Sequence, residues 1–245
     1  MSTICLTQAR LTSKRLPNKI LMPIYKKHNA LSLLHARLKK SRLLDEHIYL
    51  IPDTIENQIL KEWLDYNKYK YSIGPEYDLV QRHLISCPKD TNIIVRITSD
   101  CPLVDPAWVD VAISLFKVLE IDYISTYTPA STSKFCNGSD IEVFSFQTLK
   151  LLANNFYEPR DKEHVTFPLW DGRAQKSCMT LNSLIQDPIN DIRITLDYEE
   201  DLTALRILGE QINLESANLS DIVKAYRSSG LSRLNGHFKY DAGWN

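Results

Sequence analysis

Residues 93–106 read IIVRITSDCPLVDP, and this stretch decides the fold. Its opening run has the apolar, β-branched composition of a buried strand. The run leads to Asp100 and a proline-containing turn. Asp105 before Pro106 then predicts the start of a helix, because Asp is a favoured N-cap and Pro a favoured first helical residue. A strand, a turn and a helix in this order form the unit from which α/β proteins are built.

The same alternation continues along the chain and predicts βαβ units with mostly parallel strand pairing. The expected strands are 3–7, 47–51, 69–73, 92–97, 122–126, 140–144, 176–181 and 191–196. The expected helices are 30–43, 54–66, 77–86, 106–118, 145–154, 162–170, 199–212 and 219–228. We interpret the polar segment 128–139 as a long active-site loop. The tail 229–245 is expected to be irregular and to dock on the body or on a partner subunit.

Composition excludes several classes of protein. The 245 residues are 44% hydrophobic and 24% charged, which is typical of a globular chain and fits one α/β domain over residues 1–245. A net charge of -1 argues against bulk binding of nucleic acid. Because there is no long apolar window and no signal-peptide pattern, we expect a cytoplasmic protein. The scattered cysteines contain no CxxC pair, so we expect reduced thiols that pack in the interior: Cys5, Cys87, Cys101, Cys136 and Cys178.

Charge is distributed unevenly. Residues 1–44 contain ten of the 29 Lys and Arg side chains and no Asp or Glu. This asymmetry predicts that the first segment faces an anion. We interpret Lys39, Lys40 and Arg42 as a solvated helix face, whereas residues 8–19, QARLTSKRLPNK, form a basic loop directly after the first strand.

A basic loop after the first strand of an α/β sheet is suited to a nucleoside triphosphate. Ligands bind at the carboxyl ends of such strands, and Arg and Lys side chains surround phosphate oxygens. The loop is neither a P-loop nor a GxGxxG fingerprint. From spacing alone, a solvated basic turn remains an equal alternative.

Two acidic residues follow predicted strands, Asp100 and Asp197. Carboxylates at strand ends are well placed to hold Mg²⁺ together with phosphate oxygens. Residues 191–202 read DIRITLDYEEDL, so Glu199, Glu200 and Asp201 are interpreted as caps of a helical first turn, and for Asp197 the capping and metal roles both stay open. A basic loop with two such carboxylates is the constellation for transfer at a phosphate.

The histidines give little support to hydrolytic chemistry. His83 and His164 fall on predicted helices and are interpreted as structural residues. The chain has no HExxH motif and no Ser, His and Asp in the order of a hydrolase triad.

Together these segments resemble the cytidylyltransferase family, which includes the acylneuraminate and 3-deoxy-manno-octulosonate cytidylyltransferases. The most similar branch is the one named for spore coat polysaccharide biosynthesis protein F. The family patterns QARxxSxRLPGK, RITGDCPLIDP, DGxDVEVFS, REHVT and RLTVDxxEDL resemble residues 8–19, 96–106, 137–145, 162–166 and 193–202. The tail 235–244 also resembles the ending of that branch.

This resemblance implies a three-layer α/β/α sandwich of the nucleotide-diphospho-sugar transferase, glycosyltransferase-A-like, fold. It implies a Mg²⁺-dependent enzyme that transfers CMP from CTP to an acidic sugar or to a phosphate- or phosphonate-bearing acceptor. Pyrophosphate would be released, and the product would serve capsule, other surface polysaccharide or related glycoconjugate synthesis. The expected partners are CTP and a small anionic acceptor, without nucleic acid or membrane, in a homodimer.

The resemblance also implies roles for single residues. Arg15, Lys19 and Asp100 would be catalytic, and Asp100 and Asp197 would bind Mg²⁺. The residues implied for the nucleotide and acceptor side are Gln8, Ala9, Arg10, Ser13, Arg15, Lys19, Gly74, Asp78, Arg82, Thr98, Ser99, Asp140, Glu142, Glu163 and His164.

Three positions depart from the family pattern. Asn18 replaces a loop Gly, and the turn is expected to survive because Asn tolerates the left-handed conformation. Ser99 replaces the Gly before Asp100, which puts strict CTP preference in doubt. Lys162 replaces an Arg, which weakens bidentate contact with an anion.

Two other functions remain open at this stage. A glycosyltransferase of the same fold would consume a nucleotide sugar, and a DxD metal motif, absent here, would favour it. A non-catalytic module would bind nucleic acid or another anionic polymer through residues 10–42. Interleaved aromatic residues would favour the module, and only Tyr25 occurs there.

Overall fold

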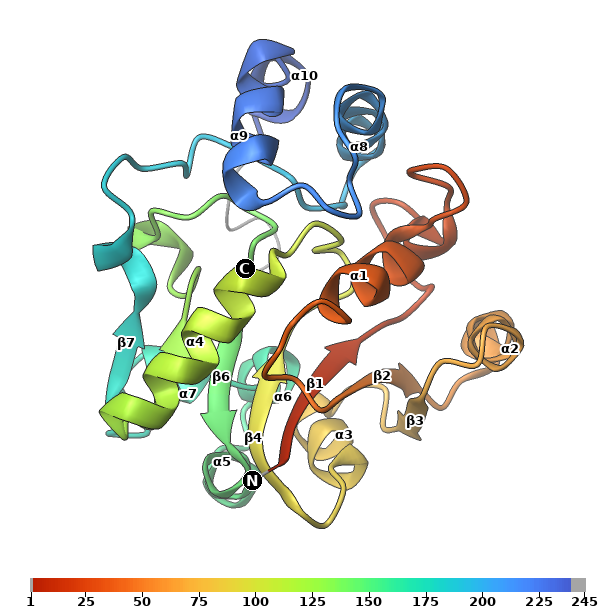
Figure 1. Cartoon of the computed structure of the whole chain (residues 1–245). Coiled ribbons are helices and arrows are strands. Elements are labelled where there is room, and N and C mark those ends of the chain that lie inside the picture. Colours follow the sequence, from red (N-terminus) through yellow and green to blue (C-terminus); the bar gives the residue numbers. More distant parts are fainter. Residues whose placement is uncertain (1, 239–245) are drawn as a thin grey trace.

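A seven-stranded β-sheet runs through the centre of the computed structural model, which describes residues 2–238 (Figure 1). The strand order is β3-β2-β1-β4-β6-β5-β7. Pairing is parallel except where β6 runs antiparallel to its neighbours β4 and β5, so the prediction of a mostly parallel sheet is confirmed. The strands are β1 (Ser2–Gln8), β2 (Glu46–Pro52), β3 (Tyr71–Gly74), β4 (Thr91–Arg96), β5 (Tyr123–Ser125), β6 (Glu142–Ser145) and β7 (Cys178–Thr180).

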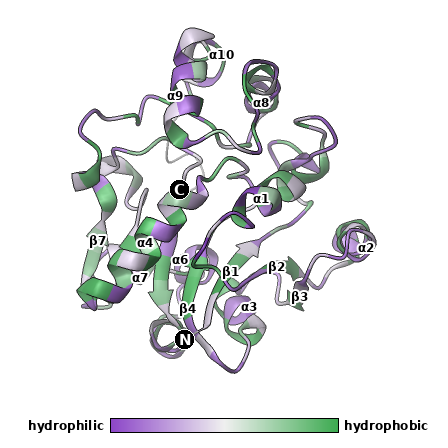
Figure 2. Ribbon diagram, viewed as in Figure 1, coloured by the Kyte–Doolittle hydropathy of each residue, from purple (hydrophilic) through white to green (hydrophobic). Residues whose placement is uncertain are grey.

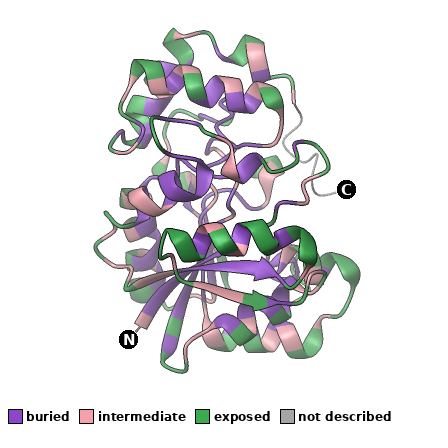
Figure 3. Ribbon diagram, turned by 90° about the vertical axis from the view of Figure 1, so that its right-hand side faces the viewer, coloured by how far each residue is buried: buried purple, intermediate pink, exposed green. Residues whose placement is uncertain are grey.

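Helices cover both faces of the sheet and complete three layers. Side chains alternate along each strand: Ile4 and Leu6 pack on one face, and Cys5 packs on the other. Figure 2 shows the hydrophobic strands, and Figure 3 shows them buried between helices that are exposed on their outer sides. The Cys5 face is covered by α1 (Ala30–Leu38), α2 (Gln58–Tyr66), α4 (Pro106–Leu119), α8 (Glu199–Gln211) and α9 (Leu219–Ser228). The other face is covered by α3 (Leu79–Ser86), α5 (Phe146–Asn155), α6 (Pro159–His164) and α7 (Phe167–Trp170).

The predicted strand 191–196 is wrong. This segment is extended, but it forms only a single bridge, between Arg193 and Asn137. Asn137 lies just before β6, at the edge of the sheet where the parallel strands end. The segment therefore crosses the carboxyl ends of the strands instead of joining the sheet, and its apolar residues are buried there.

Two predicted helices are shorter or broken. The helix expected at 30–43 ends at Leu38, and the following turn is held by the Asp110 carboxylate, which accepts hydrogen bonds from the backbone N–H groups of Arg42 and Leu43. The helix expected at 162–170 is interrupted at Val165, whose φ is 53°. The loop 128–139 contains a short 3₁₀ turn, η3 (Ala130–Thr132).

The tail is partly regular. A helical turn, α10 (Ser232–Asn235), ends in the fully buried Asn235, so the expectation of an irregular tail is wrong there. Phe238 stacks on Tyr198 with ring centroids 4.0 Å apart, which confirms docking on the body. Residues 239–245, with most of the branch-like ending 235–244, lie outside the described residues.

One basic residue of the segment 1–44, Arg37, lies in the protein interior. Arg37 is fully buried and donates hydrogen bonds to the carbonyl groups of Leu103, Val104, Leu214 and Ala217. Burial lowers the pKa of its guanidinium to about 10. The prediction that the whole basic segment faces an anion is therefore wrong for Arg37, which joins α1 to the turn after Asp100.

The cysteines are all free. Cys5, Cys101 and Cys136 are buried as expected, whereas Cys178 is exposed, so the packing prediction is wrong for that residue. Within residues 2–238 no helix combines the length and apolar character needed to span a membrane.

Three histidines, the fully buried His83 and the half-buried His35 and His47, stay neutral. His83 is fully buried on α3, with Nδ1 2.7 Å from the Leu79 carbonyl oxygen, which confirms its structural interpretation. Burial lowers the pKa of His83 and of His47 to about 3 each, and that of His35 to about 4. The Nδ1 atoms of His35 and His47 lie 3.0 Å apart, so at most one of them carries a proton.

We expect the free energy of unfolding to fall on acidification. The unfolded chain protonates its histidines near pH 6.5, whereas the folded pKa of His83 is about 3. The stabilisation is therefore complete above pH 6.5 and is lost as the pH falls toward the folded pKa, by about 1.4 kcal/mol per pH unit for each histidine. Urea unfolding between about pH 7 and 5 measures this slope. His83→Leu should have a shallower slope than the wild type, and parallel curves would contradict the prediction.

Candidate active site

Two loops meet at the carboxyl ends of β1 and β4. The Asp100 carbonyl oxygen accepts hydrogen bonds from the Leu196 backbone N–H, at 2.8 Å, and from Thr195 Oγ1, at 3.1 Å. Asp100 follows β4, and Asp197 ends the segment that crosses the sheet. This backbone connection brings the two aspartates to the same place although they are 97 positions apart.

A glycine permits this crossing. Gly138 has a φ of +101°, and a Cβ atom built on it would lie 2.3 Å from the Thr195 backbone nitrogen. Any side chain at this position would therefore push residues 194–195 away from the loop that leads into β6.

Lys19 joins the two carboxylates. Its Nζ lies 3.3 Å from Asp100 Oδ2 and 2.8 Å from Asp197 Oδ1, and the lysine side chain is 9% exposed. Arg15 Nη2 lies 2.6 Å from the same Asp197 oxygen. The basic loop and the two aspartates therefore converge as the sequence predicted, although Asp197 follows an irregular segment and not a strand.

The cluster fixes the charge states of its members. Burial by itself would lower the pKa of Lys19, but the neighbouring carboxylates of Asp100 and Asp197 outweigh burial and raise it. Burial would raise the pKa of Asp100, but the Lys19 ammonium and the Thr98 hydroxyl lower it. An ammonium between two carboxylates is thus the stable arrangement at neutral pH.

The turn that presents Lys19 depends on Asn18. Asn18 has a φ of 58° and precedes the 3₁₀ turn η1 (Lys19–Leu21). Its backbone N–H donates to the Leu11 carbonyl oxygen at 3.1 Å. The prediction that Asn preserves the left-handed turn is confirmed.

Asp197 is positioned by a buried ion pair. The Asp201 carboxylate accepts the backbone N–H groups of Asp197, at 2.9 Å, and Tyr198, at 3.0 Å, which confirms its capping role. Arg193 forms two hydrogen bonds of 2.8 Å with Asp201, and Asn235 donates a third, of 2.9 Å. Sequence reasoning missed Arg193, although a charged residue inside an apolar run is a sign that it has a buried partner.

A second buried network lies at the end of β1. Arg96 donates to Gln8 Oε1 at 3.0 Å and also contacts Glu142. Glu142 in turn accepts hydrogen bonds from the hydroxyl groups of Tyr123 and Thr166. Of these residues, only Gln8 and Glu142 were implied for the site. Arg96 was missed as well, although it too is a charged residue inside an apolar run.

Arg82 stabilises the loop between β3 and α3. It is 2% exposed, and its guanidinium donates to the Pro75 and Glu76 carbonyl oxygens. Burial, and then the nearby Arg10 charge, lowers its pKa to about 10. Its side chain packs against Gly74: a Cβ atom built on Gly74 would lie 2.8 Å from Arg82 Cγ.

The remaining implied residues are spread around these groups. Asp78 is the N-cap of α3 and pairs with Lys162 Nζ at 3.2 Å, so that lysine is neutralised within the protein. Glu163 is exposed, and the His164 ring lies 6.3 Å from that of Phe167. Ala9 and Ser99 are buried, Ser13 accepts a backbone hydrogen bond, and Thr98 contacts Cys101.

Asp140 lies close enough to Asp100 and Glu142 to interact with their charges. Burial raises its pKa to about 8, with further contributions from the charges of Asp100 and Glu142. Its Oδ1 is buried and has no hydrogen-bond partner among the described residues.

The carboxylates of Asp100 and Asp197 could hold a cation whose remaining ligands come from a bound molecule and from water. Oxygens of Asp100 and Asp197 already surround one ammonium group. Within residues 2–238 no group of three or more His, Cys, Asp or Glu side chains is arranged to hold a metal. Mg²⁺ accepts one or two carboxylates when phosphate oxygens and waters complete its shell, so the residues present fit it.

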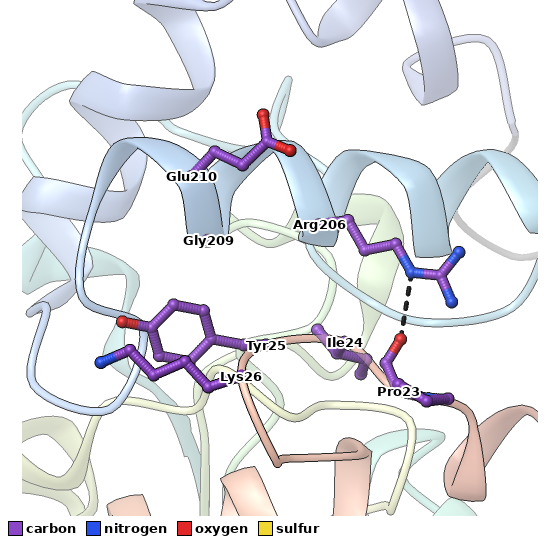
Figure 4. Close-up of a pocket in the computed structure, with 7 residues that line it drawn as sticks. All are labelled: Pro23, Ile24, Tyr25, Lys26, Arg206, Gly209 and Glu210. Atoms are coloured by element: carbon purple, nitrogen blue, oxygen red, sulfur yellow. Dashed lines mark hydrogen bonds between the residues drawn. The ribbon is translucent and has the colours of Figure 1, made fainter.

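A separate hollow of about 450 Å³ lies between residues 23–26 and α8 (Figure 4). Arg206 donates to the Pro23 carbonyl oxygen at 3.0 Å on one side of it. The hollow shares no residue with the aspartate cluster. Its lining consists of Pro23, Ile24, Tyr25, Lys26, Arg206, Gly209 and Glu210.

No protein-family model matches the chain. The chain is 28% identical to the uncharacterized protein MJ1063 of Methanocaldococcus jannaschii, over 91% of this chain and 89% of that protein. It is 26% identical to the spore coat polysaccharide biosynthesis protein SpsF of Bacillus subtilis, over 86% of this chain and 90% of that protein. The resemblance to the spore coat branch is therefore confirmed.

Two solved structures share the fold. A cytidylyltransferase from Leptospira borgpetersenii superimposes with a TM-score of 0.87 at 24% identity, covering 98% of this chain and 99% of that one. A CMP:2-keto-3-deoxy-manno-octonic acid synthetase complexed with CTP gives a TM-score of 0.64 at 13% identity, covering 86% and 99%. The predicted nucleotide-diphospho-sugar transferase architecture is confirmed.

We expect Gly138→Ala to destabilise the protein by about 3 kcal/mol or more, because the left-handed φ strains the residue and the new Cβ meets the Thr195 backbone. Gly172→Ala is the matched control: its φ is +86°, but nothing lies within 4 Å of the added Cβ. The control should lose only about 1 kcal/mol. Chemical unfolding of both variants measures the difference, and equal losses would refute the proposed close contact.

Proposed function

We propose that the protein is a cytidylyltransferase that transfers CMP from CTP to a small anionic acceptor and releases pyrophosphate. The observation that carries this proposal is the convergence of Arg15 and Lys19 with Asp100 and Asp197. The similarity to a named cytidylyltransferase and to a synthetase complexed with CTP supports the choice of nucleotide. The similarity to SpsF supports a role in surface polysaccharide or glycoconjugate synthesis.

The topology supports the same location for the nucleotide. The chain proceeds outward from β1 to β2 and β3 and then returns to place β4 on the opposite side of β1. The strand order therefore reverses between β1 and β4. Open α/β sheets bind ligands at the carboxyl ends of the strands beside such a reversal, and Figure 1 shows α8 and α9 beyond these ends.

The proposed reaction is a direct displacement. An acceptor oxygen attacks the α-phosphorus of CTP and forms a new P–O bond. The bond from the α-phosphorus to the bridging oxygen breaks, and pyrophosphate leaves with the electron pair. Arg15 and Lys19 would bind phosphate oxygens and stabilise the departing pyrophosphate.

Asp100 and Asp197 would hold Mg²⁺, which would neutralise charge on the phosphate oxygens. In the protein without nucleotide, Lys19 keeps these two carboxylates close together. A bound triphosphate gives the ammonium group a second set of anionic oxygens to contact. The arrangement of the site is thus prepared by the chain itself.

The acceptor would meet Arg160. Arg160 is exposed, lies 3.9 Å from the centre of the Phe167 ring, and forms no ion pair within residues 2–238. Arg82 and Lys162, in contrast, are engaged by protein atoms. An acidic sugar would attack through its anomeric hydroxyl, and a phosphate or phosphonate compound through an anionic oxygen. Both classes carry a negative charge for Arg160.

The burial of Lys19 and Arg37 weakens the polymer-binding alternative, because residues 10–42 do not present a continuous solvent-facing basic surface. Our proposal retains a single domain over residues 1–245, Mg²⁺ as the metal, a homodimer and a cytoplasmic location. Capsule synthesis remains one of the roles to be tested.

Thermal unfolding with Mg²⁺ and each of the four ribonucleoside triphosphates tests the nucleotide. CTP should raise the melting temperature most, because a ligand bound only by the native state stabilises it. Asp100→Asn should abolish most of this increase, whereas Asp90→Asn, at an exposed position, should keep it. The absence of any increase with CTP would refute the proposal.

Pyrophosphate release tests the reaction. With CTP, Mg²⁺ and a panel of nonulosonic acids and phosphorylated or phosphonate acceptors, the wild type should release pyrophosphate. Asp100→Asn should be slower by about 10²–10³-fold if this carboxylate acts at the transition state. Wild-type turnover by the folded variant would contradict its role. Consumption of a nucleotide sugar without pyrophosphate release would instead support the glycosyltransferase alternative.

A further inference from the structure

The buried network at the end of β1 determines how one glutamine faces the site. Arg96 is 7% exposed and donates from Nη2 to Gln8 Oε1 at 3.0 Å. Its Nη1 contacts Glu142. Because arginine has only hydrogen-bond donors, the Gln8 atom that faces it must be the carbonyl oxygen.

The arginine itself is held in place. Glu142 is 5% exposed, and its other oxygen accepts the Tyr123 hydroxyl at 2.5 Å and the Thr166 hydroxyl. The guanidinium is therefore fixed between Glu142 and Gln8. Its Nε is buried without a partner among the described residues.

This orientation leaves the Gln8 amide nitrogen free. Within residues 2–238 it donates to no protein acceptor, and the side chain is partly exposed. Gln8 ends β1 and Arg96 ends β4, so both residues border the reversal of strand order where a ligand binds. An amide donor whose orientation is fixed by Arg96 therefore lies at the end of β1 that borders the proposed nucleotide site.

We propose that Arg96 positions the Gln8 amide as a hydrogen-bond donor to the nucleobase, and that this favours cytosine over uracil. The inference rests on the proposed function. O2 is an acceptor in both bases, so only a contact of the amide donor at N3 discriminates between them: N3 is an acceptor in cytosine and carries a hydrogen in uracil. A free amide would rotate to accept that hydrogen, but Arg96 prevents the rotation. Arg96 is thus a positioning residue and Gln8 a specificity residue.

The test compares CTP with UTP in the pyrophosphate assay. Gln8→Glu has nearly the same shape, keeps a contact with Arg96 and presents an acceptor to the base. We expect the ratio of kcat/KM for CTP to that for UTP to fall at least tenfold, mainly through KM for CTP. Gln211→Glu, an exposed position at the end of α8, is the charge-matched control and should keep the wild-type ratio.

A double variant tests the positioning step. Arg96→Met with Glu142→Gln removes both charges together and leaves the Gln8 amide free to rotate. Its CTP to UTP ratio should move toward one, with near-ultraviolet circular dichroism used to check folding. If this variant does not fold, Gln8→Glu still decides the question.

The outcomes separate the two proposals. A wild type that neither binds CTP nor releases pyrophosphate overturns the proposed function and this inference with it. A wild type that uses CTP and UTP equally, or a folded Gln8→Glu variant with the wild-type ratio, overturns this inference alone.

Discussion

The hydrogen bonds to the Asp100 carbonyl are the constraint on which the candidate site depends. They come from the Leu196 backbone and the Thr195 hydroxyl, so they tie the turn after β4 to a segment from the far end of the chain. Without this connection the two aspartates would belong to independent loops. The Lys19 ammonium then links their side chains, and the carboxylates in turn keep the ammonium charged. Backbone geometry and charge thus reinforce one another.

Buried arginines play a common role in this structure. Arg37 holds the turn after Asp100, Arg193 holds the helix start behind Asp197, and Arg96 holds the end of β1 against β6. Each guanidinium binds several acceptors at once, which a shorter polar side chain does not match. A buried charge is tolerated only when such partners surround it. Contacts with the interior therefore hold these three segments, in addition to local conformational preferences such as that of Asn18.

The sequence predicted the parts of the fold that depend on local pattern. Apolar runs located the strands of the sheet, and Asp105 with Pro106 located the start of α4. The basic loop and Asp100 were also found, because the parallel strands β1 and β4 end at a shared edge, whereas Asp197 reaches the same place through a segment that is not a strand. The failures concern long-range partners. Segment 191–196 has the composition of a strand, yet only the folded chain decides that Asn137 and Asp100 are its neighbours. Arg37 and Arg82 are buried, but nothing in the local sequence around them distinguishes them from exposed arginines.

Lys19 acts as an internal counterion, and this has a consequence for the order in which ligands arrive. A bare divalent ion entering between the aspartates would have to displace an ammonium that has no other anion to contact. A metal–nucleotide complex would supply phosphate oxygens for the Lys19 ammonium, and Asp100 and Asp197 would then be available to hold the metal. If the proposed function holds, the ion pairs of Lys19 would disfavour binding of a free cation and would favour entry of the metal together with the nucleotide.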